Sequence, residues 1–215
     1  MKTHFSAAAA LTALMTCAPM MAQAQDGPWS LRIGLAGIGF DESATVKQNG
    51  AVVPGASFTT DNDASVVFSL GYRFSERFSA EATVGIPPTA TLNGSGPLAG
   101  LTLGEVTYGP ATVTGLYHMP LTEGLEAYVG GGVNDTLVFG TEDAALTNFK
   151  VDNAWAPVVQ AGLSGAIQGT NTDWFVDVKY IPLKTKATGM VGPNTASADI
   201  TLNPTIITAG IGINF

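Results

Sequence analysis

Residues 205–215 read TIITAGIGINF and decide how the chain folds. In an extended strand, alternate side chains point to opposite faces. One face carries Thr205, Ile207, Ala209, Ile211, Ile213 and Phe215; the other carries Ile206, Thr208, Gly210, Gly212 and Asn214. An apolar face backed by smaller or more polar residues is typical of a membrane β-barrel, whose wall faces lipid on one side and a lumen on the other. We expect this strand to begin near Ala196 and to run unbroken to Phe215.

The composition of the 215-residue chain favours one all-β domain in a membrane. Charged residues make up 12% of the chain, well below the usual quarter, and its 26 glycines suit tight turns better than helices. No window holds the roughly 18 consecutive apolar residues that a membrane-spanning helix requires. The sequence therefore excludes a helical membrane protein and predicts an eight-stranded antiparallel transmembrane β-barrel with up-and-down meander topology.

The amino terminus predicts an export signal. Lys2 precedes an apolar segment, residues 7–15, and Ala22-Gln23-Ala24 forms an A-x-A cleavage site. We assign residues 1–24 to a signal peptide and residues 25–215 to the barrel domain. A short amphipathic helix of the mature protein is the alternative.

Cleavage would limit the chemistry of the mature chain. It would remove Cys17, so neither a disulfide nor a thiol nucleophile would remain, and it would leave His118 as the last histidine. A histidine metal cluster is then excluded, and we expect neither enzyme activity nor a cofactor. Without Lys2, eight basic residues face 17 acidic ones, a net charge of −9, which argues against a nucleic-acid partner.

Seven earlier segments repeat the alternation. The expected strands cover residues 29–40, 66–74, 78–86, a fourth segment ending at 119, 126–139, 153–167 and 174–183, before the carboxy-terminal strand. Long polar loops (41–63, 89–103, 140–151, 184–197) alternate with short turns (75–77, 120–124, 168–172). This order describes an up-and-down barrel with periplasmic turns and extracellular loops.

Aromatic residues fall at the short-turn ends of the strands, where they would form an interfacial girdle. They are Trp29, Phe74, Phe78, Tyr117, Trp174 and Phe215. A soluble calycin barrel is the alternative fold. It would point its apolar face inward and would need a more charged exterior than this chain can supply.

The motifs along the chain resemble those of the OmpW family of small outer-membrane barrels, which includes the alkane-importing AlkL branch. The matching motifs are Trp29-x-Leu31-Arg32-x-Gly34, Gly109-Pro110-Ala111-Thr112-Val113 with Leu116-Tyr117-His118, Ala127-Tyr128-Val129-Gly130-Gly131-Gly132-Val133-Asn134, Asp152-x-x-Trp155, Asp173 to Ile181, Asn203-Pro204 and Gly210 to Phe215. Ala127 replaces a common proline and Lys179 a common arginine. Ile86-Pro87-Pro88-Thr89 departs from the family, which often has a histidine there, so no role of that histidine can be transferred.

The resemblance implies a lumen dominated by apolar side chains and suited to small hydrophobic molecules. We expect an outer-membrane channel of the bacterial cell for their passive uptake, with outer-membrane lipid as its surroundings. Alternation along the strands places a set of side chains on the lumen face, and these are the ligand-contact candidates: Ile38, Val67, Leu116, Tyr128, Asn134, Val158, Phe175 and Ile206. The barrel-assembly machinery is a further expected partner, through Phe215.

The alternative function is a structural or receptor barrel without transport. Eight strands leave an interior just wide enough for side chains to fill. A cavity in the upper lumen would discriminate between the two.

Alternation also places five charged residues on the lumen face near the periplasmic strand ends: Arg32, Arg73, Glu81, Asp177 and Lys179. A narrow barrel would bring them close enough to pair, and burial without a partner would be costly. We expect a charge network that plugs the periplasmic floor; a gate for polar solutes is the alternative.

Five prolines lie about 9–11 residues from the periplasmic ends of their strands, which is about one membrane crossing. They are Pro87, Pro110, Pro157, Pro182 and Pro204. Proline has no N–H and removes a ladder hydrogen bond, so we expect a belt of weakened strand pairing near the outer leaflet. Pro87 and Pro110 are the candidates for a lateral opening, and harmless bulges are the alternative.

Overall fold

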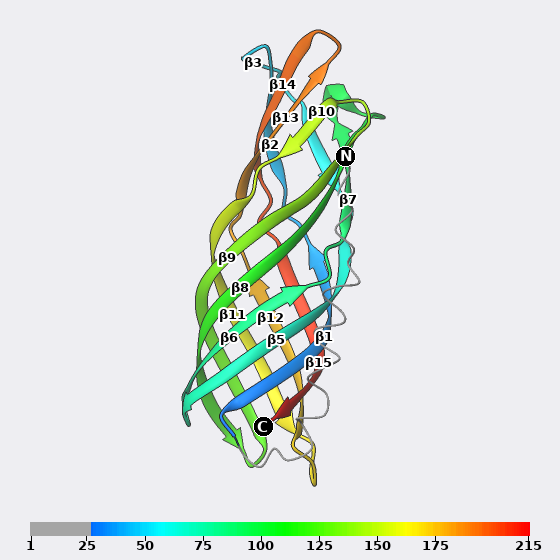
Figure 1. Ribbon diagram of the computed structural model, residues 1–215. Helices are drawn as coiled ribbons and strands as arrows, with labels where there is room; N and C mark the ends of the chain where they lie inside the picture. Colours follow the sequence, from blue (N-terminus) through cyan, green and yellow to red (C-terminus); the bar gives the residue numbers. More distant parts are fainter. Residues whose placement is uncertain (1–26) are drawn as a thin grey trace.

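The computed structural model describes residues 27–215 and shows a tall barrel of tilted antiparallel strands (Figure 1). The barrel strands are β1 (Trp29–Gly39), β5 (Asp63–Ser75), β6 (Phe78–Gly85), β8 (Thr102–Thr122), β9 (Leu125–Asp143), β11 (Ala154–Ala166), β12 (Thr172–Tyr180) and β15 (Thr205–Asn214). The expected signal peptide, residues 1–24, lies outside the described residues. Within residues 27–215, no helix is long and apolar enough to cross a membrane.

Each barrel strand pairs with its neighbour in chain order, and the last strand returns to the first. The closing register runs from Ser30↔Asn214 to Gly39↔Thr205. The predicted eight-stranded antiparallel barrel with meander topology is therefore confirmed.

The alternation of the carboxy-terminal strand separates a lipid face from a lumen face. Ile207 and Ile211 are 58% and 51% exposed, whereas Ile206 and Thr208 are 6% and 3% exposed. At the short-turn end, Trp29 meets Tyr72 edge-on with ring centroids 4.8 Å apart.

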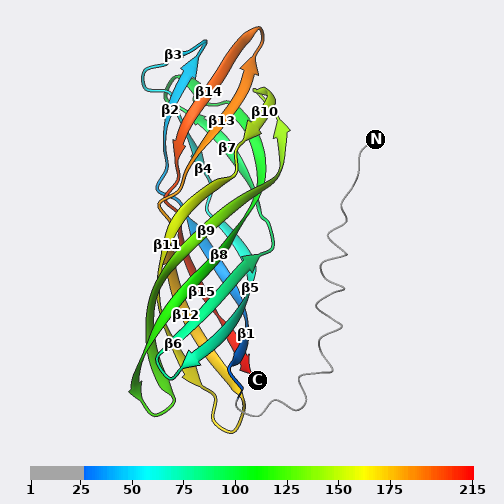
Figure 2. The ribbon, with the colours of Figure 1, turned by 60° about the vertical axis from the view of Figure 1, so that its left-hand side comes forward.

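Most of the segments expected as extracellular loops are strands. A second sheet, which we call the extracellular sheet after the side expected for these loops, consists of five strands in this order: β10 (Thr147–Val151), β13 (Lys184–Val191), β14 (Asn194–Thr201), β2 (Ser43–Gln48) and β3 (Ala51–Val52). β4 (Ser57–Thr60) and β7 (Thr89–Ser95) extend the barrel sheet beside β8, and the short η2 (Gly96–Leu98) follows β7. Figures 1 and 2 show this part as an upward extension of the barrel, opposite its short turns.

The expected unbroken strand from Ala196 to Phe215 is wrong. β14 ends at Thr201 and β15 begins at Thr205. Asn203 has a φ of 39°, in the left-handed region that interrupts a strand, and Pro204 has no N–H to continue the ladder. The break separates the membrane barrel from the extracellular sheet.

A similar break lies beside Pro87 and Pro110, and we call residues 85–88 together with residues 108–110 the proline seam. The β6–β8 register ends at Val84↔Ala111, and β8 next pairs in register with β7 at Thr89↔Thr107. Between these pairs, the N–H of Tyr108 donates to the carbonyl of Pro88 (3.1 Å). On its other side, β8 stays paired with β9 through the seam. Backbone pairing is therefore weakened on one side of β8 and kept on its other side.

Candidate functional site

The upper lumen contains an inner cavity of about 70 Å³ with an almost wholly apolar lining. It lies at the level where the barrel strands meet the extracellular sheet. Side chains from both parts line it, among them Ile38, Phe40, Tyr108, Pro110, Ile181, Leu183 and Ile206. The cavity therefore lies directly behind the proline seam.

An outer cavity of about 190 Å³ lies further out, between the barrel sheet and the extracellular sheet. Its lining is also mostly apolar and includes Val46, Leu98, Leu101, Leu103, Leu146 and Phe149. Phe58, Leu92 and Ile200 line both cavities, are 5%, 7% and 4% exposed, and belong to one packed cluster. We call these three residues the constriction, because they line both cavities where the two meet.

The two cavities and the constriction form a narrow path through the upper lumen. A single water needs about 10–15 Å³ on the same scale, so the 70 Å³ of the inner cavity holds only a few water-sized groups. Side chains must therefore shift before a solute of several carbons can pass.

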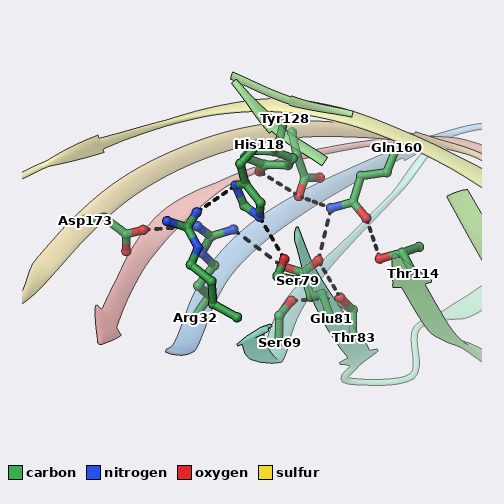
Figure 3. A network of polar contacts seen from close by, with 12 residues as sticks. Arg32, Ser69, Ser79, Glu81, Thr83, Thr114, His118, Tyr128, Gln160 and Asp173 are labelled. Carbon is green, nitrogen blue, oxygen red and sulfur yellow. Dashed lines mark hydrogen bonds and ion pairs between the residues drawn. The ribbon is translucent and has the colours of Figure 1, made fainter. Parts of the chain in front are cut away.

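The lower lumen is filled by a buried polar network, which we call the plug (Figure 3). Arg32 bridges two carboxylates: its guanidinium lies 3.4 Å from Glu81 and 3.0 Å from Asp173. Lys179 bridges Glu81 and Asp177, with its Nζ at 3.4 and 3.3 Å. These opposite charges offset one another where burial would otherwise be costly.

Neutral side chains complete the plug. The Gln160 amide donates to Glu81 and to Asp177, both at 3.0 Å. The Tyr128 hydroxyl donates to Asp177 at 3.4 Å. Gly162 leaves room for the Tyr128 ring, since a Cβ at this glycine would lie 2.4 Å from Tyr128 Cζ. The lumen is thus packed around Gln160 and Tyr128, and a polar pocket of about 300 Å³ lies on the periplasmic side, lined by residues that include Arg32, Glu81 and His118.

Arg73 belongs to a separate cluster below the plug. Its guanidinium contacts Glu126 and, at 2.8 Å, His118 Nδ1. His118 Nε2 lies 2.8 Å from the Ser79 hydroxyl. Both ring nitrogens of His118 are therefore engaged in hydrogen bonds, as in a structural histidine.

The eight ligand-contact candidates lie at different heights in the lumen. Ile38 and Ile206 line the inner cavity, and Val67 and Val158 pack in the same apolar cluster as these two. Asn134 is fully buried and donates to Thr136, which lines the cavity. Leu116, Tyr128 and Phe175 lie lower: Leu116 lines a polar pocket at the periplasmic end, and the other two rings contact Arg32.

Several residues of the path were missed by sequence reasoning. Phe58 and Leu92 belong to segments expected as loops, whereas Ile200 lies in the expected carboxy-terminal strand but is not among the ligand-contact candidates. The short alternation Thr89-Ala90-Thr91-Leu92 carried the signal for a strand in one of these loops. The plug partners Asp173 and Gln160 were also missed, although both lie on the lumen face.

The prolines differ in their surroundings. Pro110 lines the inner cavity and still pairs with Thr136 of β9. Pro87 and Pro182 follow the ends of β6 and β12, in breaks of the wall. Pro157 lies in the part of β11 beyond the last β12 partner, Val159↔Tyr180.

Comparisons with known proteins agree with this architecture. The protein PahQ of the dibenzothiophene metabolism operon of Pseudomonas aeruginosa is 39% identical over 194 residues, covering 89% of this chain and 90% of that protein. The outer membrane protein AlkL of Ectopseudomonas oleovorans is 34% identical over 178 residues, covering 81% and 76%.

Solved structures show the same barrel. AlkL in DMPC lipid bilayers superposes with a TM-score of 0.73 at 32% identity, covering 90% of this chain and 92% of that one. The outer membrane protein OprG of Pseudomonas aeruginosa, at 23% identity, has a TM-score of 0.81 over 89% of this chain and 97% of that one. The fold and these relatives place the protein in the bacterial outer membrane. The sequence model of the OmpW family matches residues 25–215, and the chain belongs to this family.

Proposed function

We propose that the protein is a passive outer-membrane channel for small hydrophobic molecules. The observation that carries this proposal is the pair of apolar cavities that meet at the constriction, above the plug. An apolar lining lowers the free energy of a hydrophobic solute, and such a path leads inward from the extracellular end. The names of PahQ and AlkL, from a dibenzothiophene operon and an outer membrane, support this class of function.

The exit we propose is lateral. Below the inner cavity, a solute would have to displace the buried ion pairs of the plug, and breaking such pairs is strongly unfavourable. The proline seam lies beside the same cavity, where Pro87 and Pro110 have no N–H to donate to a ladder. A hydrophobic solute that leaves there enters lipid instead of water.

The competing function, a structural or receptor barrel, needs an interior without a solute path. The two cavities favour the channel over that alternative. The plug residues Arg32, Glu81, Asp177 and Lys179 act in our proposal as the closed floor. Recognition of Phe215 by the barrel-assembly machinery concerns biogenesis and is independent of transport.

Uptake of a hydrophobic fluorescent probe into intact cells tests the channel. Cells with the protein should take up the probe faster than cells without it. Ala154 lines the inner cavity, so Ala154→Phe should fill it and return uptake to the rate of cells without the protein. Ala161→Phe, on the exposed face of the same strand, is the matched control and should not change uptake. Equal uptake with and without the wild-type protein would contradict transport.

A further inference from the structure

The outward face of the extracellular sheet is polar and rich in lysine. Its side chains lie in three rows across paired strands: Lys184, Thr201 and Ser43; Lys186, Asp199 and Thr45; and Lys150, Thr188, Ser197 and Lys47. The residues that alternate with them, such as Ala187 and Ile200, are buried. We call these three rows the lysine face; Figure 2 shows β2, β14 and β13 side by side at the upper end of the molecule.

The lysine face concentrates positive charge on an acidic protein. Residues 27–215 contain eight lysines and arginines, and four of them lie on this face. Asp199 on the face and Asp152 at its edge oppose them, which leaves a local excess of two positive charges. The whole chain, by contrast, has a net charge of −8.

Asp199 neutralises part of the lysine face. Its carboxylate lies 2.7 Å from Lys47 Nζ and 3.8 Å from Lys186 Nζ. The hydrogen bond from Lys47 and the charge of that lysine lower the pKa of Asp199. Among residues 27–215, Lys150 and Lys184 have no carboxylate within 4.0 Å, so they remain available to an external anion.

The face is also hollowed. A hollow of about 600 Å³ is lined by the hydroxyls of Ser43, Thr45 and Thr201, by Lys184 and Lys186, and by the carboxylates of Asp152 and Asp199. Lys47 and Lys150 lie outside this lining. Ammonium groups and hydroxyls in one concave surface can donate hydrogen bonds to phosphate and sugar oxygens together.

The position of the lysine face relative to the membrane suggests its occupant. Trp155 and Tyr180 are 70% and 42% exposed at the upper ends of β11 and β12, as interfacial aromatic residues are. Lys184 follows Tyr180 by four residues and Lys150 precedes Trp155 by five. At about 3.3 Å per residue along a tilted strand, these lysines lie just above the hydrocarbon, at the level of outer-leaflet headgroups.

We propose that the lysine face binds the phosphorylated sugar headgroup of a glycolipid in the outer leaflet. The lysines pair with its phosphates, and the serine and threonine hydroxyls bind its sugar oxygens. This contact fixes the extracellular sheet to the membrane surface. It does not depend on solute transport.

Lipid binding by the full barrel in uncharged detergent, at low salt and with a metal chelator, tests the proposal. The probes are bisphosphorylated lipid A, the same lipid without its phosphates, and inorganic phosphate. We expect lipid A to bind and the dephosphorylated lipid to bind at least about tenfold more weakly. Since one lysine near an anionic lipid surface contributes about a fivefold factor, Lys184→Gln with Lys186→Gln should weaken lipid A binding roughly 25-fold.

Two further variants make the test independent of folding defects. Asp199→Asn removes the competing carboxylate and should tighten lipid A binding severalfold, which damage to the sheet would not do. Arg77→Gln removes one positive charge at an exposed site in the opposite turn and should leave binding unchanged. Wild-type affinity in the double lysine variant, equal binding of the dephosphorylated lipid, or no tightening in Asp199→Asn would overturn the proposal. Displacement of lipid A by inorganic phosphate at equal concentration would assign the face to free phosphate instead.

Discussion

Tyr108 donates a hydrogen bond from its hydroxyl to Asp63 Oδ2, at 2.8 Å. The two residues belong to β8 and to the first position of β5, strands that β6 separates lower in the wall. Because β6 ends at Gly85, this side-chain contact joins β8 to β5 beside the proline seam. Tyr108 also lines the inner cavity, so it connects the solute path with the wall.

Tyr108→Phe tests this contact as a restraint on lateral exit. A typical hydrogen bond stabilises by about 0.5–1.5 kcal/mol, so its loss should raise the population of an opened seam, and with it probe uptake, by roughly two- to tenfold. Tyr117→Phe is the control, because it removes a hydroxyl that accepts from Arg77 at the periplasmic end of the same strand. Unchanged uptake in Tyr108→Phe would mean that this contact does not limit exit.

Replacing both seam prolines tests the lateral route itself. Pro87→Val with Pro110→Val supplies two N–H donors and should strengthen pairing between β8 and its neighbours, so probe uptake should fall to the rate of cells without the protein. Hydrogen exchange at the Tyr108 amide should slow in parallel. Pro120→Val, in the periplasmic part of β8, provides the matched control. Wild-type uptake in the double variant would rule out release at this seam.

Phe58→Ala tests the constriction as a size filter. Loss of this ring opens the passage between the two cavities, so uptake of bulky or branched probes should rise more than uptake of linear ones. Phe139→Ala makes the same change at a 61% exposed site on β9 and should not alter the ratio. Competition between a linear and a branched probe in one culture measures the effect. An equal rise for both probes would place the size filter elsewhere.

Arg32→Met tests the plug. The variant leaves Glu81 and Asp173 buried without this cation, and removing one partner of a buried pair costs about 3–5 kcal/mol. The free energy of unfolding in urea should fall by about this amount. Arg77→Met, at an exposed arginine, should change it by less than about 1 kcal/mol. Equal stability of the two variants would show that the network does not brace the barrel.

The barrel could be predicted from the sequence because lipid and lumen impose opposite demands on alternate residues. Ile207 and Ile206 differ by one position, yet one faces lipid and the other the lumen. The extracellular strands lack this contrast between large apolar and polar side chains. In Lys184–Val191, one face meets water and carries polar residues, while the other meets a small cavity and carries mostly small ones. Reading the extracellular strands as loops placed the cavity-lining side chains of Phe58 and Leu92 outside the expected lumen.

The pairing within the plug could not be predicted for a different reason. The alternation of β1 shows that the side chain of Arg32 points into the lumen. Alternation does not show how far each strand is shifted along its neighbour. That stagger is set by the shear of the closed barrel, and it brings Arg32 of β1 next to Asp173 of β12, across the intervening β15.

This placement has a consequence for the order of assembly. Arg32 can meet Glu81 as soon as β1, β5 and β6 have paired, since these strands follow one another in the chain. It can meet Asp173 only after the first strand has joined the last, because β15 lies between them. Until then the arginine lacks one of its two carboxylate partners, and water can still reach its guanidinium. Closure of the ring both encloses Arg32 and completes its ion pairs, so the two are coupled in one cooperative event.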